Sequence, residues 1–303
     1  MTTIVHRGMP NLKEVKNRIS SVISTQQITK AMKMVAAAKL RKSQERITQM
    51  RPFAQKLSAI LTNLSSVQSD NDSDNWYSAA REEKKILIVA VSSDRGLCGS
   101  FNSNVFKGVN KLIADKYQAQ YEKGDVTVLV IGRKANDFFA KRKVGLIDQF
   151  TTLFLNLTFE KVSEIAAFIM KSFREGKYDK VEIVYNQFKN VATQIIQAEQ
   201  MLPILPPKTE GTKAVEIDYI YQPDQAEILS GLIPKSLTVQ LYKAVLDSNA
   251  SENGARMTAM DKATDNAGEL LKELRLSYNR TRQAAITKEI LEIVAGAEAL
   301  KSA

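Results

Sequence analysis

Apolar residues recur at alternating three- and four-residue spacings along the N-terminal part of the chain. The series begins at Leu12 and ends at Leu64. This spacing is typical of a helix that packs along one continuous face in a coiled coil. Only Pro52 disturbs it, and a proline ring can bend a helix without ending it. We therefore predict an N-terminal coiled-coil helix over residues 10–68.

The same spacing returns at the other end of the chain. Ala267 and Leu271 begin one frame, a second run from Ile286 repeats it one register over, and no proline follows Pro234. This pattern predicts a C-terminal coiled-coil helix over residues 225–303. Two such helices at opposite chain ends pair most simply as an antiparallel coiled coil. Since the C-terminal helix is the longer, we expect its tip to project beyond its partner.

The pattern changes between the two helices. Short runs rich in β-branched residues occupy positions 86–91 (ILIVAV), 126–131 (VTVLVI) and 181–185 (VEIVY). Such runs are typical of buried strands. Helical patterns lie between these runs, near residues 105–118, 134–143 and 159–175. Alternation of strands and helices predicts a parallel, doubly wound sheet.

The sheet is thus expected to form a domain inserted into a helical hairpin. We place this α/β domain at residues 84–202, and Thr193–Glu199 within it adds a strand in another direction. A looser segment at residues 203–224 connects it to the C-terminal helix. The predicted fold class is α/β with long helices, an antiparallel coiled coil that carries a Rossmann-like, mainly parallel sheet domain.

The N-terminal frame falters at one place. Gln26, Thr29 and Lys33 occupy frame positions, while an apolar row runs one position earlier, starting at Ile28. Residues 250–266 are the counterpart in the C-terminal helix, where polar residues also dilute the frame. One interpretation is a coiled-coil stutter, which rotates the apolar stripe around the helix. The other is that this segment also contacts a third surface, with its lysines facing acidic groups.

Composition narrows the classes of partner. The 303-residue chain is 44% hydrophobic and 25% charged, as in soluble globular proteins. A formal net charge of +10 favours acidic partners such as nucleic acid, anionic lipid or an acidic protein surface, and its sign alone does not choose among them. A nucleic-acid-binding protein would gather its basic residues on one face, whereas here they are scattered among Glu and Asp.

The chain carries one cysteine, Cys98, and one histidine, His6. A single cysteine excludes an internal disulfide, and with no Cys/His cluster the usual zinc sites are excluded as well. Because His6 lies in an N-terminal extension ahead of the first helical pattern, we expect no Ser-His-Asp or Cys-His arrangement. We expect Cys98 to be a small buried residue, and we expect neither a metal nor a cofactor. No apolar stretch reaches the roughly 18 residues that a membrane span needs, and no signal peptide is visible.

The segment SSDRGLCGSFN, which follows the first strand, is the best candidate for a small-molecule site. Ligands in open parallel sheets bind at the carboxyl ends of the strands. However, its only glycines, Gly96 and Gly99, match neither the Walker nor the dinucleotide pattern. Asp94 and Arg95 are its only charged residues, so an α/β enzyme with helical arms has little support. We interpret these two as a structural pair or a subunit contact.

Three separated motifs together resemble the γ subunit of F-type ATP synthases. They are TQQITKAMKMVAAAKLRK near the start, SSDRGLCGSFN after the first strand, and a C-terminal run that begins with ARMTAMDKATDNAGELL. They occur in the order that the family has, and the similarity spans Pro10 to Ala299. The loosest parts are the extension before Met9 and the connectors on either side of the sheet domain.

The resemblance implies a non-catalytic rotary shaft of F1Fo ATP synthase, a subunit of an ion-transporting enzyme complex. In that family the paired helices stand inside a hexamer of α and β subunits, and the β subunits hold the catalytic sites. The α/β domain meets the ε subunit and the c-subunit ring, with no nucleic acid and no cofactor. The chain lacks the cysteine pair of chloroplast forms, so we expect a bacterial protein, peripheral at the cytoplasmic face of the inner membrane.

The resemblance also assigns roles to single residues. Those that match partner-contact positions on the α/β hexamer are Met32, Lys33, Arg256, Arg282, Gln283, Thr287 and Glu292. The first two match positions near an acidic β-subunit loop, which the surplus positive charge of the chain fits. Arg256 and Gln283 match residues that hydrogen-bond to β-subunit loops. The remaining three match positions where substitutions affect coupling.

Overall fold

The computed structural model describes residues 11–66, 76–78, 81–204 and 225–301. The chain divides into two compact units. Unit 1 comprises Met1–Val35 and Ala259–Ala303, and unit 2 comprises Ala36–Thr258. The predicted connector at 203–224 lies almost entirely outside the described residues.

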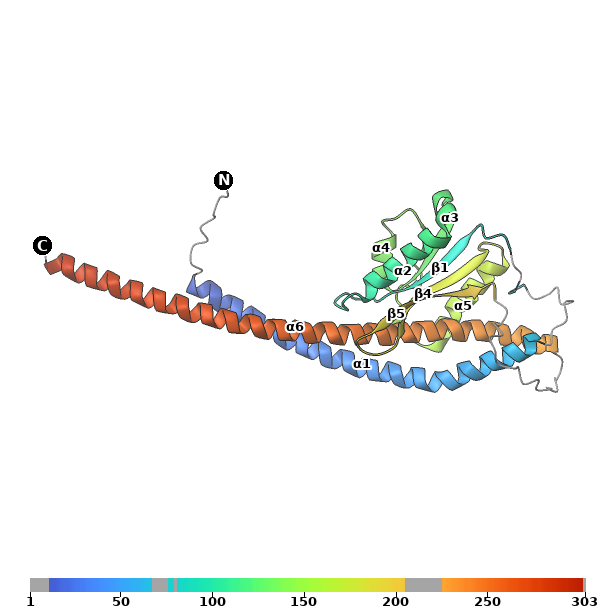
Figure 1. Cartoon of the computed structure of the whole chain (residues 1–303), viewed down its shortest axis with the longest axis horizontal. Helices are drawn as coiled ribbons and strands as arrows, with labels where there is room; N and C mark the ends of the chain where they lie inside the picture. Colours follow the sequence, from blue (N-terminus) through green and yellow to red (C-terminus); the bar gives the residue numbers. More distant parts are fainter. Residues whose placement is uncertain (1–10, 67–75, 79–80, 205–224, 302–303) are drawn as a thin grey trace. The chain divides into compact units, whose positions relative to one another are not determined.

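Two long helices contribute to both units. Helix α1 spans Leu12–Ser66, with Pro52 inside it, and α6 spans Gln225–Lys301. In unit 1 they run in opposite directions, because Gln26 Nε2 donates to the carbonyl oxygen of Thr264 while Lys33 contacts Asp261. The prediction of two antiparallel helices is confirmed, and α1 continues through its proline (Figure 1).

Unit 2 contains a five-stranded sheet in the order β3-β2-β1-β4-β5. Strands β1 (Ile86–Val91), β2 (Val126–Ile131), β3 (Gly145–Ile147) and β4 (Lys180–Phe188) are parallel, and β5 (Gln194–Leu202) is antiparallel to β4. This confirms the mainly parallel sheet and the reversed last strand. The sequence pattern missed β3, because three residues with an exposed glycine give no strand signal.

Helices cover both faces of the sheet (Figure 1). One face carries α2 (Phe101–Lys116), α3 (Gln118–Lys123) and α4 (Arg133–Phe139); the other carries α5 (Phe159–Arg174) and part of α6, and a 3-10 turn, η1 (Leu153–Leu155), precedes α5. Alternate residues along a strand pack into two hydrophobic cores, one on each face of the sheet. Ile88 packs toward α2, whereas its neighbour Val89 packs toward α5 and α6. Complete burial of β1 explains why its sequence is uniformly apolar.

Within unit 2, α1 also packs on α6 in the antiparallel sense. Leu40 and Ile47 of α1 form a buried cluster with Leu246 and Ala250 of α6. Beside this cluster the Ser43 hydroxyl donates to Asn249 Oδ1 at 2.6 Å. Helix α6 is therefore enclosed here between α1 and the sheet, which places its residues next to the carboxyl ends of the strands.

Candidate functional site

The carboxyl edge of the sheet is the first candidate for a ligand site, because ligands of open parallel sheets bind at the carboxyl ends of the strands. The chain passes outward from β1 to β2 and β3 and then returns to β4 on the other side of β1. In doubly wound folds ligands bind at such a reversal. Here α6 fills it. Ser251 donates to the carbonyl oxygen of Asn186 at 3.0 Å, and Ser248 donates to that of Val91 at 3.5 Å.

The β1–α2 loop, residues 92–100, is a tightly bonded turn at this edge. The Ser93 amide donates to Asn102 Oδ1 at 3.0 Å, and the Ser93 hydroxyl donates to the carbonyl oxygen of Arg95 at 2.7 Å. Cys98 is buried, and burial raises the pKa of its thiol. The prediction of a structural cysteine is confirmed. The hydrogen bonds of Ser93 therefore hold the loop in a compact turn.

Arg256 of α6 closes this loop from the side. Its guanidinium donates to the carbonyl oxygen of Gly96 at 2.5 Å and to that of Arg95 at 3.3 Å. The same group pairs with Glu252 Oε1 at 2.5 Å. Burial raises the pKa of the Glu252 carboxyl, and the Arg256 charge opposes that shift. The Glu252–Arg256 ion pair of α6 therefore contacts the β1–α2 loop, the loop that resembles a nucleotide-binding turn.

The two charged residues of the loop form no ion pair with each other. Asp94 Oδ1 accepts a long hydrogen bond, 3.4 Å, from the Arg133 amide at the start of α4. Partial burial raises the pKa of the Asp94 carboxyl. Among the described residues no ion pair joins Asp94 to Arg95, so a structural ion pair between them is wrong, and a subunit contact stays a prediction.

In unit 1 the helix seam continues through polar residues. Thr29, only 8% exposed, lies with its hydroxyl oxygen 2.8 Å from that of Thr264, and Lys33 pairs with Asp261. The apolar row beside it faces outward, with Ile28 at 59% exposure. The stutter interpretation is wrong, since the frame positions keep facing α6. The outward apolar row agrees with the alternative of a third contacting surface.

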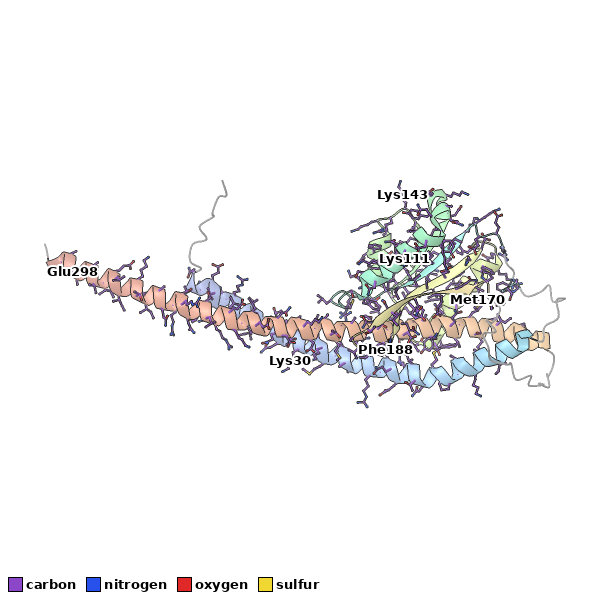
Figure 2. All side chains as sticks on the ribbon, in the orientation of Figure 1. Lys30, Lys111, Lys143, Met170, Phe188 and Glu298 are labelled. Atoms are coloured by element: carbon purple, nitrogen blue, oxygen red, sulfur yellow. The ribbon has the colours of Figure 1, made fainter. Side chains whose placement is uncertain are left out.

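The last part of α6, residues 282–300, is exposed along its whole length except at Ala285. We call it the α6 end. It includes large apolar side chains, among them Ile290 and Ile293, at 54% and 72% exposure. Figure 2 shows its side chains projecting to all sides near Glu298, with no other described element beside it. A bare apolar helix surface of this kind is typical of a protein interface.

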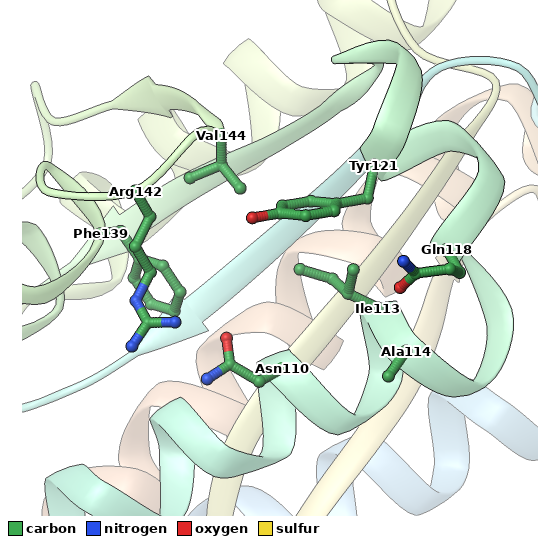
Figure 3. Close-up of a pocket in the computed structure, with 8 residues that line it drawn as sticks. All are labelled: Asn110, Ile113, Ala114, Gln118, Tyr121, Phe139, Arg142 and Val144. Carbon is green, nitrogen blue, oxygen red and sulfur yellow. The ribbon is translucent and has the colours of Figure 1, made fainter.

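A cavity of about 180 Å³ lies on the other side of the α/β domain, between α2, α3 and the segment after α4 (Figure 3). Asn110, Gln118, Tyr121 and Arg142 are its polar lining residues, and the remainder are apolar. The lining contains no carboxylate, histidine, cysteine, serine or lysine, so it holds no pair of groups suited to acid–base or nucleophilic catalysis.

In the described part of the chain, no group of three His, Cys, Asp or Glu side chains is arranged to hold a metal ion. Within the same residues, no helix combines the length and the apolarity needed to cross a membrane.

Comparison with known sequences identifies the family. The family model described as ATP synthase matches residues 11–300. The ATP synthase gamma chain of Cytophaga hutchinsonii is 55% identical over 296 residues, which cover 97% of this chain and 100% of that one. The chain belongs to the ATP synthase gamma chain family. The gamma chain of Chlorobium phaeobacteroides is 47% identical over 294 residues, covering 97% of this chain and 99% of that one.

Solved structures agree with this family. A chain of the Tetrahymena thermophila mitochondrial ATP synthase central stalk and c-ring structure is 26% identical, with a TM-score of 0.54 over 78% of this chain and 99% of that chain. A chain of the Euglena gracilis mitochondrial enzyme has the same fold, with a TM-score of 0.62 at 22% identity over 97% of this chain and 95% of that chain. The family member described here is therefore a subunit of an ATP synthase complex.

The residues predicted to contact the α/β hexamer lie in both units of the chain. In unit 1, Met32 and Lys33 are half-buried on α1. The other unit 1 residues lie exposed on the α6 end, and they are Arg282, Gln283, Thr287 and Glu292. Arg256, in unit 2, is engaged within the chain. The contacts of these residues with other subunits stay predictions.

Sequence reasoning missed Glu252, Ser248 and Ser251, the α6 residues that occupy the sheet edge. A signal for them was present, because residues 248–255 are mostly small and include Gly254. A methyl group on Gly254 would lie 3.4 Å from the Phe188 ring. A helix can approach a strand end this closely only where its side chains are small.

Proposed function

We propose that the chain is the non-catalytic rotary shaft of F1Fo ATP synthase. It couples ion-driven rotation of the c-subunit ring to sequential conformational change in the α3β3 hexamer, and so to ATP synthesis or hydrolysis. The catalytic sites belong to the β subunits, and the shaft supplies none of the reacting groups. The complex works at the cytoplasmic face of the bacterial inner membrane, where this chain is peripheral.

The observation that carries this proposal is the bare surface of the α6 end. Side chains such as Ile290 and Ile293 are exposed to solvent in the isolated chain, which costs free energy unless a partner covers them. A hexamer that encloses a central shaft provides such a cover. Helix α6 passes well beyond the described seam residues, so its end is available for this enclosure.

Rotation can act on the β subunits only through unequal contact. A shaft that touched every β conformation in the same way would shift none of them. The proposed contact residues would provide this unequal contact through the following partners. Met32 and Lys33 contact an acidic β-subunit loop, and Arg256 and Gln283 hydrogen-bond to β-subunit loops. Arg282, Thr287 and Glu292 contribute to coupling, and the α/β domain contacts the ε subunit and the c ring.

Single-molecule rotation tests the proposal directly. The chain would be co-expressed with the α and β subunits, and the purified complex would be fixed to a surface through β. The control is the α and β subunits expressed without this chain. A probe attached to a Lys143→Cys variant should label selectively, since Cys98 is buried and Lys143 is exposed. We expect a stoichiometric complex whose probe rotates when ATP is added. An active complex with a stationary probe, or ATP hydrolysis by the isolated chain, would overturn the proposal.

A further inference from the structure

Arg256 joins α6 to a loop far away in the sequence. Its acceptors, the carbonyl oxygens of Gly96 and Arg95, are 160 and 161 residues distant. The side chains of Arg256 and Glu252 are only 12% and 13% exposed. A guanidinium has a planar fork of donors that can serve adjacent acceptors at once, which a lysine ammonium cannot do with the same geometry. The carboxylate of Glu252 balances its charge in this half-closed space.

The β1–α2 loop has few other attachments to α6. Its internal hydrogen bonds, such as Asn102 Nδ2 to Ser93 Oγ at 2.8 Å, hold its shape but do not reach the helix. A small apolar cluster joins Cys98 of the loop and Phe101, the first residue of α2, to Ala255 of α6. Leu97 at the loop tip is 66% exposed and has a positive φ of 64°. Such a conformation persists only where the surroundings hold it.

We propose that Arg256 is a positioning residue, which with Glu252 clamps the β1–α2 loop to α6 so that the loop and the helix move as one body. The inference rests on the proposed function, because a rotating shaft transmits torque between its α/β domain and its helices only through rigid attachments. Arg256 thus acts inside the chain, whatever contact it also makes with a β subunit. Glu252 orients the guanidinium toward the two carbonyl oxygens.

The thiol of Cys98 reports on the clamp without any added probe. It is the only cysteine of the chain, it is 2% exposed, and it lies two residues from Gly96. The experiment measures the rate at which an aromatic disulfide reagent modifies Cys98 in the assembled complex, with cysteine-free α and β subunits. The variants are Arg256→Gln, Arg256→Lys and Glu252→Gln. Arg275→Gln, a change of the same type on an exposed part of α6, is the matched control.

Release of the loop should raise the modification rate of Cys98 by roughly tenfold or more in Arg256→Gln, since local opening then costs less free energy. Arg256→Lys should restore part of the protection, Glu252→Gln should raise the rate less than Arg256→Gln, and Arg275→Gln should match the parent. Parental rates in all Arg256 and Glu252 variants would overturn the clamp. If Arg256→Gln fails to assemble, Arg256→Lys and Glu252→Gln decide the matter by the same criterion.

A second measurement separates the clamp from the shaft function. ATP-driven ion pumping, divided by ATP hydrolysis, should fall in Arg256→Gln and recover in part in Arg256→Lys. An unchanged ratio together with faster Cys98 modification would refute the role in transmission. Failure of the parent chain to support rotation would instead count against the proposed function and leave the Cys98 result intact.

Discussion

The hydroxyl oxygens of Thr29 on α1 and Thr264 on α6 lie 2.8 Å apart. A coiled coil would ordinarily place apolar side chains at such a seam position. Thr29 is nevertheless buried, and its neighbours in the frame, Gln26 and Lys33, also bond to α6. The seam of unit 1, which also buries Val15 and Leu271, therefore includes one polar layer. Such a layer specifies the register and contributes less burial than apolar pairs.

The threonine pair gives the first prediction. Thr29→Val or Thr264→Val alone leaves one hydroxyl without its cross-helix partner and should lower the free energy of unfolding by about 1 kcal/mol. The double variant should regain most of this loss, because both polar groups are then gone. A double-mutant cycle by denaturant unfolding measures the coupling. Thr25→Val, an exposed change on α1, is the control, and additive single effects would contradict the prediction.

The ion pair between Lys33 and Asp261 should add little to stability. Its side chains are 38% and 47% exposed, and pairs in such positions contribute less than about 1 kcal/mol because water and salt screen them. We expect Asp261→Asn to lower the melting temperature slightly at low salt and not at high salt. The double variant Lys33→Asp with Asp261→Lys, which exchanges the two charges, should have the melting temperature of the parent. A large, salt-independent loss would show that the pair is more than a surface contact.

A charge at Met32 should affect coupling more than folding. Met32 is the half-buried member of the apolar row that begins at Ile28 on α1. Met32→Glu or Met32→Lys should leave assembly and thermal stability near those of the parent, while ion-driven ATP synthesis falls. Met32→Leu, which keeps the apolar volume, is the control and should synthesise ATP normally. Near-normal synthesis in the charged variants would argue against Met32 as a contact residue.

At position 97 a glycine should be more stable than an alanine. It adopts a φ of 64° while its side chain is 66% exposed. A left-handed conformation costs an L-residue roughly 1–2 kcal/mol, which glycine avoids in exchange for some chain entropy. Leu97→Gly should therefore stabilise the protein by up to about 1 kcal/mol relative to Leu97→Ala, which keeps the strain. Chemical unfolding of the two variants compares them, and equal stability would refute the explanation.

Buried tyrosines should make the chain sensitive to alkali. Tyr117 donates to Glu182 and Tyr185 donates to Glu199; burial raises the pKa of both phenols, and the glutamate partners raise it further. In the unfolded chain a tyrosine ionises near pH 10. The stabilisation is complete below that pH and is lost as the pH rises above it, because only the unfolded state releases the proton.

The measurement is the free energy of unfolding between neutral pH and about pH 12. Tyr185→Phe should be less stable than the parent at neutral pH, since Glu199 loses its donor, and its stability should fall less steeply in alkali. Tyrosinate absorbance should show that Tyr117 and Tyr185 ionise only as the protein unfolds. Identical alkaline slopes in parent and variant would contradict the assignment.

Much of the architecture could be predicted from local patterns. The strands at Ile86–Val91 and Val126–Ile131 have the bounds that their apolar runs indicated. Helix α1 continues through Pro52 as expected. These features depend on residues close together in the sequence, where hydrophobic periodicity and backbone preferences act directly. The weaker signals failed, as at β3, where too few residues carry a pattern.

The candidate site at the sheet edge could be predicted less completely than the fold. The glycine spacing of SSDRGLCGSFN was enough to argue against a nucleotide cradle, but not to show what replaces one. The structure gives the reason, since Ser248, Ser251 and Arg256 of α6 occupy the sheet edge. These contacts join residues that are 65 to 160 positions apart. No local pattern encodes which distant side chain reaches a given carbonyl oxygen.

The sequence by itself determined the two long helices, the inserted parallel sheet and the family, because periodicity and motifs are properties of neighbouring residues. Only the tertiary structure decided which faces meet. It placed Thr29 and Lys33 in the seam rather than on a rotated stripe, and it turned Arg256 inward onto the β1–α2 loop. Polar side chains suit either a seam or a surface, so only the partner that the fold brings opposite each one settles its role.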